Sequence, residues 1–147
     1  MSIGFDCHEL DDLTNDMLDL AQNKFPKDTK AFMGRAGNRF RSKAREAYKS
    51  ETRKHTGNLL KGLNRGRPYI YGSDEYSVRV YNNAPHAHLI EHGHVEWIHL
   101  PQMQHAVKTE RYVRGRNIMG KQANDFKGEF PDEVEDFVDK LLDEGKL

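Results

Sequence analysis

Five of the chain's eight histidines lie in one fourteen-residue stretch, HAHLIEHGHVEWIH, at residues 86–99. The stretch contains H-x-x-E-H, formed by His88, Glu91 and His92, which is the signature of the inverted zinc peptidases. On a helix, two imidazoles four residues apart face the same side and can bind zinc together. Glu91 beside them could act as a general base toward a metal-bound water. One hypothesis is therefore a small metal-dependent hydrolase.

Three observations favour a structural interpretation of the same stretch. Inverted zinc peptidases resemble one another over domains much larger than this 147-residue chain. They also need a third protein ligand from a downstream helix, where this chain offers only an acidic face typical of a solvated surface. With five histidines in fourteen residues, a pair four positions apart is nearly expected by chance. We therefore predict that the protein is not an enzyme and has no catalytic residue, metal or cofactor.

No other motif points to catalysis. The sequence lacks G-x-S-x-G, a Walker loop and C-x-x-C. Its single cysteine, Cys7, excludes an internal disulfide and a cysteine-based zinc site, and the adjacent His8 gives poor geometry for a catalytic dyad. Trp97, in VEWIHL, is interpreted as core or interface packing rather than as a ligand platform.

Length and composition indicate one domain, residues 1–147, with a modest core. Hydrophobic residues make up 36% and charged residues 31%, a polar balance that favours an elongated shape or assembly. The start, MSIGFDCHEL, does not resemble a signal peptide, and no apolar run reaches transmembrane length. We therefore expect a product that is soluble and intracellular when made, with no membrane partner.

The formal net charge of zero conceals an uneven distribution, with acidic ends flanking a basic segment. Residues 1–23 carry −6, residues 24–65 carry +10, residues 66–120 carry +1 and residues 121–147 carry −5. The acidic ends could neutralise the basic segment within one subunit or between neighbouring subunits. Residues 1–25 are expected to form an N-terminal acidic helix that is either mobile or bound to a partner.

The basic segment is expected to be a long helix. Apolar spacing predicts a first helix over residues 8–23, and Pro26 suits the opening of a second that runs to about Lys54. Apolar residues recur every fourth position of the second helix, at Phe32, Ala36, Phe40, Ala44 and Tyr48. Its basic face comprises Arg35, Arg39, Lys43 and Arg53. Such a face could contact DNA without sequence specificity, although a solvated face is the simpler interpretation.

The remaining pattern is mixed. Residues 56–66 indicate a break and a loop, and two alternating segments around Gly72-Ser73-Asp74 predict a β-hairpin. A short helix opened by Pro85 should end at Gly93, and residues 94–116 fit either a strand or an extended loop. A last amphipathic helix follows, kinked or restarted at Pro131. The fold class is α+β, with a small antiparallel sheet packed against an N-terminal long helix and a C-terminal helix.

Two motifs and their order carry a family resemblance. HTGNLLKGL (55–63), a hairpin and VYNNAPHAHLIEHGH (80–94) together resemble the gp-ten-like tail-component family of long-tailed bacteriophages. The family pattern is Thr-Gly-x-Leu, a strand, Asn-x-Ala-Pro-Tyr-Ala, an apolar pair and Glu-x-Gly. The matching positions, with Asn82 beside them, are Thr56, Gly57, Leu59, Asn83, Ala84, Pro85, Ala87, Glu91 and Gly93.

The resemblance places the histidines at substitutable positions, since His86 and His92 stand where the family usually has an aromatic residue. It covers roughly residues 30–142, with one departure, YVRGRNIMG in place of the family's usual P-A-R-P-F-L. We expect the family motif and Trp97 to serve as interface or architecture.

The resemblance implies a structural virion protein that is synthesised in the host cytoplasm and assembled into the neck or tail. It would be a neck or tail-completion subunit that joins the head connector to the tail tube. The implied assembly is a homo-oligomeric ring of six-fold or twelve-fold symmetry, with non-specific contact with packaged DNA as a further expectation. A metal-dependent hydrolase and a DNA-binding accessory module are the alternatives.

Overall fold

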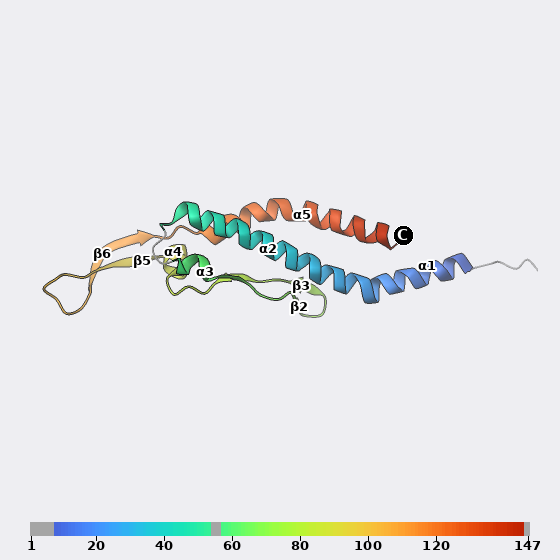
Figure 1. Cartoon of the computed structure of the whole chain (residues 1–147), viewed down its shortest axis with the longest axis horizontal. Coiled ribbons are helices and arrows are strands. Elements are labelled where there is room, and N and C mark those ends of the chain that lie inside the picture. Colours follow the sequence, from blue (N-terminus) through green and yellow to red (C-terminus); the bar gives the residue numbers. More distant parts are fainter. Residues whose placement is uncertain (1–7, 54–56, 146–147) are drawn as a thin grey trace, which may run out of the picture.

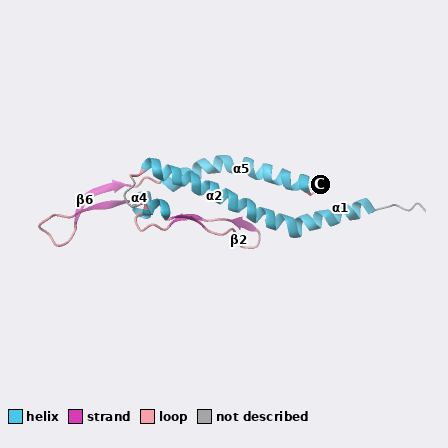
Figure 2. Cartoon of the chain, viewed as in Figure 1, coloured by secondary structure: helices cyan, strands magenta, loops and turns pink. Residues whose placement is uncertain are grey.

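The computed structural model describes residues 8–53 and 57–145 as an elongated α+β chain, confirming the predicted fold class (Figures 1 and 2). The elements, in chain order, are α1 (His8–Asp19), the π-helical segment η1 (Leu20–Lys24), α2 (Phe25–Glu51), α3 (Asn58–Lys61), β1 (Leu63–Arg65), β2 (Tyr69–Tyr71), β3 (Glu75–Ser77), β4 (Val80–Asn82), α4 (Ala87–His92), β5 (Gly93–Ile98), β6 (Val107–Arg114) and α5 (Ile118–Glu144). At one end of the molecule α1 projects, and at the other the β5–β6 hairpin does (Figure 1).

The two N-terminal helices expected from the sequence are one continuous helix. The amide of Phe25 donates to the carbonyl of Leu20, five residues earlier, and Pro26 follows in the first turn of α2. Proline lacks an N–H and ends a helix when it removes an interior bond, but here it lies directly after the wider π turn. Pro26 is therefore accommodated without a break.

An antiparallel pair of long helices, α2 and α5, forms the body of the molecule (Figure 1). The rings of Phe32 and Phe137 stack with centroids 4.5 Å apart, and Phe40 meets Phe126 edge to face at 5.4 Å. Phe130 lies between these contacts and stacks on both Phe32 and Phe126. Pro131 lies inside α5 without ending it, so the helix continues past the predicted kink or restart.

The hydrophobic core is small and lies where α2 meets β1 and the start of α5. Its central side chains, Ala44, Tyr48, Leu63 and Ile118, have no exposed surface. Partly buried residues pack around them, namely Ala47, Leu59, Leu60, Val80, Ile90 and Met119. The apolar face predicted for the second helix therefore supplies the core with Ala44 and Tyr48.

In the described part of the chain the strands form three separate two-stranded antiparallel sheets, β1–β4, β2–β3 and β5–β6, where one small sheet was expected. The predicted hairpin around Gly72 is confirmed as β2–β3. The alternating segment that follows the Gly72 turn forms two strands rather than one. The first, β3, ends at Ser77, and the second, β4, begins at Val80 and pairs with β1. Residues 94–116 form most of the β5–β6 hairpin, which resolves the choice between a strand and a loop.

Gly93 ends α4 in a conformation that requires glycine, as predicted. Its φ of 85° and ψ of 170° lie in a region that only glycine occupies readily. A Cβ atom there would lie 2.5 Å from the Tyr112 hydroxyl and 2.6 Å from the Val113 carbonyl oxygen. Strain and crowding therefore act at the same residue.

We predict that Gly93→Ala lowers the free energy of unfolding by about 3 kcal/mol or more, because backbone strain and overpacking add. Gly72→Ala is the matched control, since Gly72 also has a positive φ of 65° but nothing within 4 Å of a Cβ atom. It should lose only about 1–2 kcal/mol. Urea unfolding followed by circular dichroism measures both, and equal losses would show that crowding at Gly93 contributes nothing.

Candidate assembly interface

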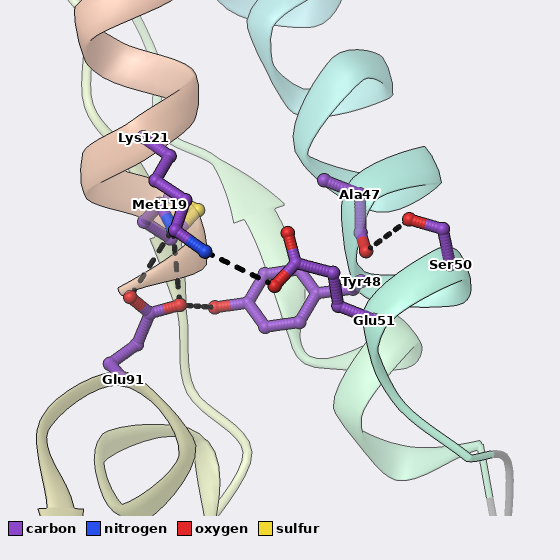
Figure 3. A network of polar contacts seen from close by, with 7 residues as sticks. All are labelled: Ala47, Tyr48, Ser50, Glu51, Glu91, Met119 and Lys121. Carbon is purple, nitrogen blue, oxygen red and sulfur yellow. Dashed lines mark hydrogen bonds and ion pairs between the residues drawn. The ribbon is translucent and has the colours of Figure 1, made fainter. Parts of the chain in front are cut away.

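A polar junction joins three elements that are distant in the sequence (Figure 3). The Tyr48 hydroxyl, from α2, donates to Oε1 of Glu91, from α4. Both carboxylate oxygens of Glu91 also accept from the backbone amide of Met119, in the first turn of α5, at 3.2 Å. Burial and the hydrogen bond to Glu91 raise the pKa of Tyr48 well above its usual range, so the hydroxyl stays protonated as a donor.

The same contacts bear on the hydrolase hypothesis. The Glu91 carboxylate, the expected general base, is bound by Tyr48 and Met119, while His88 and His92 are exposed. Within the described residues, no three His, Cys, Asp or Glu side chains are grouped so that they could hold a metal ion. The carboxylate of Glu91 is thus held by one hydroxyl and one backbone amide.

The two halves of the family motif meet beside the core. The side-chain amide of Asn82 donates to the carbonyl of Leu59 at 2.9 Å, and its oxygen accepts from the amide of Ala84 at 3.0 Å. Gly57 precedes α3 with a φ of 79°, whereas Thr56 lies outside the described residues. The motif match placed the family's asparagine at Asn83, whose backbone amide donates to the carbonyl of Gly62. It undervalued Asn82, which precedes the same Ala-Pro pair.

Large apolar side chains are exposed at the two ends of the molecule and on the β2–β3 hairpin. On the β5–β6 hairpin, Trp97 is 60% exposed and Tyr112 is 59% exposed, so Trp97 is not a core residue. Tyr71 is 67% exposed on β2, and Leu10 is 61% exposed on α1. Exposed apolar side chains of this size are often contact sites for other chains.

Comparison with known proteins decides the family. Residues 11–93 match the model of the family described as "Bacteriophage HK97-gp10, putative tail-component". The chain belongs to this family. No curated protein and no solved structure gives a significant match.

Family membership makes the chain a structural tail component of a bacteriophage and confirms the resemblance noted from the sequence. The matched region contains α2, both motif halves and Glu91, and it ends at Gly93. The β5–β6 hairpin and α5 lie beyond it. None of the described helices combines the length and apolar character needed to cross a membrane.

The four basic-face residues of this tail component do not form one uniform surface. Arg39 pairs with Glu133 and Lys43 with Glu129, both on α5, and both cations lie over the ring of Phe126. Part of the acidic C-terminal block therefore neutralises the basic helix within the subunit.

The other two basic-face residues lie elsewhere along α2. Arg35 lines a shallow hollow between α2 and α5 together with Glu144. Arg53 follows the C-terminal end of α2, where α3 and α4 approach it. Charge reversal at these four positions would consequently have unlike effects.

We predict that Tyr48→Phe lowers the free energy of unfolding by about 1.5–3 kcal/mol, since it removes a buried hydrogen bond to a charged group. Tyr112→Phe is the matched control, because its exposed hydroxyl donates to the neutral carbonyl of His92 at 2.8 Å. That change should cost only about 0.5–1 kcal/mol. Urea unfolding provides the comparison, and a smaller loss at Tyr48 than at Tyr112 would contradict the central role of the junction.

A second prediction concerns pH. The hydrogen bond and charge of Lys43 lower the pKa of the Glu129 carboxyl below its ordinary value of 4.5. The ion pair therefore stabilises the fold above pH 4.5, and this contribution is lost as the pH falls through the lowered pKa. In Lys43→Met, a carboxyl NMR titration should show the pKa of Glu129 returning toward 4.5. Lys30→Met, on an exposed part of α2, should leave it unchanged, and identical titrations in both variants would contradict the pairing.

Proposed function

We propose that this tail component assembles into a homo-oligomeric ring in the neck or tail-completion region and joins the head connector to the tail tube. Its role is assembly rather than catalysis. A ring needs head-to-tail contacts between unlike surfaces of neighbouring copies. The elongated chain exposes apolar side chains on α1 and on the β5–β6 hairpin, which lie at opposite ends (Figure 1). Six-fold symmetry would match a tail and twelve-fold symmetry a connector.

The uncovered β5–β6 hairpin is the observation that carries this proposal. It projects past the helical body, and within the described part of the chain neither β5 nor β6 pairs with a further strand. Two-stranded hairpins are marginally stable in water, and unpaired strand edges accept additional strands. A neighbouring chain that covers Trp97 and Tyr112 would stabilise the hairpin and form the contact between subunits.

We predict that the pair Trp97→Ser and Tyr112→Ser abolishes ring formation while the circular dichroism spectrum stays native, because both rings lie outside the core. Tyr71→Ser, which alters an equally exposed tyrosine on β2, is the matched control and should assemble normally. Native mass spectrometry of the three proteins gives the oligomer mass directly. Rings that survive loss of both side chains would show that the hairpin is not the contact.

The position in the particle needs its own test. Immunogold labelling of intact phage should place the protein at the junction of head and tail. Labels at the distal tip, or along the tube, would overturn the neck assignment while leaving the tail-component family intact.

A further inference from the structure

An apolar groove opens between the C-terminal end of α2, α3 and α4, with a volume of about 680 Å³. Its apolar lining comes from Leu59, Leu60, Ala84, Pro85 and Ile90. Three of these, Leu59, Ala84 and Pro85, are family-motif positions. The two motif halves thus form a surface as well as a packing contact.

The rim of this groove is cationic. Arg53 lines both the groove and the adjoining hollow, and Arg116 lines the hollow beside Ile90. Both arginines are exposed, and neither forms an ion pair with a described residue. The two acidic side chains nearest the rim on α2, Glu46 and Glu51, already pair with lysines. A partner with apolar and acidic groups would fit this surface.

Helix α1 has the complementary pattern. Leu10, Leu13 and Met17 recur along one face and are 61%, 42% and 53% exposed. At about 100° per residue, Asp11 lies on one side of this stripe and Asp16 on the other. The helix therefore presents an apolar stripe with an acidic group on each side, matching an apolar groove with a cationic rim.

A subunit cannot place α1 in its own groove. Since α1, η1 and α2 form one continuous helix, Leu10 and Lys49 are roughly 60 Å apart along it. In Figure 1, α1 lies at the opposite end of α2 from α3 and α4. Any α1 that fills the groove must come from another copy.

We propose that α1 of one subunit binds the α3–α4 groove of the next subunit. The contact is head-to-tail, so each copy uses its helix on one side and its groove on the other. As part of a ring, this contact rests on the proposed function, although helix-in-groove docking between two copies does not need the neck location. It gives Asp11 and Asp16 of α1 cationic partners, whereas neither forms an ion pair with a described residue of its own chain.

Charge reversal tests the docking in the full-length chain. One variant reverses the helix (Asp11→Lys with Asp16→Lys), and the other reverses the rim (Arg53→Glu with Arg116→Glu). Each alone should weaken self-association about tenfold or more, measured by sedimentation velocity. Lys27→Glu with Lys30→Glu is the matched control for the rim variant, because it makes the same net charge change away from the groove.

Mixing the two reversed variants should restore association, because reversed helix meets reversed rim and native helix meets native rim. An α1–α1 contact would instead leave the rim variant unweakened, and a groove that binds the β5–β6 hairpin would leave the helix variant unweakened. Unchanged association in either variant, or a mixture no stronger than its components, would overturn the proposal.

A disulfide test works in the assembled particle and separates this inference from the proposed function. Met17→Cys with Ala84→Cys, in a Cys7→Ser background, should oxidise into a ladder of cross-linked chains. Neck-located protein without cross-links would overturn α1 docking and leave the proposed function standing. Cross-linked copies located away from the neck would support α1 docking and overturn the proposed function.

Discussion

The Tyr48–Glu91 hydrogen bond is the contact on which the other elements depend. The carboxylate of Glu91, on α4, accepts hydrogen bonds from the Tyr48 hydroxyl of α2 and from the Met119 backbone amide of α5. The carbonyls of Ile90 and Glu91 also accept the amides of Arg116 and Asn117, which fixes the start of α5 to the end of α4. Because few side chains are fully buried, this polar junction provides positional precision that a larger core would otherwise supply. Glu91, the carboxylate of the H-x-x-E-H motif, thus joins α2, α4 and α5.

The distribution of charge separates contacts within the subunit from contacts left for neighbours. The acidic residues of α5 meet α2 through the ion pairs of Arg39 and Lys43, and Lys24 reaches Glu144 at the far end of α5. Exposed pairs contribute little individually, but they repeat along a helix pair already held by stacked phenylalanines. The acidic N-terminal block has no comparable partner among the described residues of the body.

Local signals in the sequence predicted local structure well. Period-four apolar spacing located α2, the Gly72 turn located β2–β3, and Gly93 marked the end of α4. Sequence could not show that Tyr48 and Glu91 meet, because their hydrogen bond spans 43 positions and depends on how α4 packs. The sequence placed Pro26 near the start of the second helix but did not show that the two helices are continuous. A π turn and a break between two adjacent helices leave similar apolar spacing. The sequence did not predict the pairing of β5 with β6, because a hairpin with an irregular register between Val95 and Trp97 does not alternate regularly.

The π turn at Leu20–Lys24 has a consequence for angular phase. A π turn holds one residue more than the α turn it replaces, so everything before it is rotated by about 100° about the helix axis. This rotation sets how the apolar stripe of α1 is oriented relative to the apolar face that α2 packs against α5. In an uninterrupted α-helix, the angle between these two faces about the helix axis would be different. One residue of helical register thus determines the side of the molecule toward which the exposed leucines of α1 face.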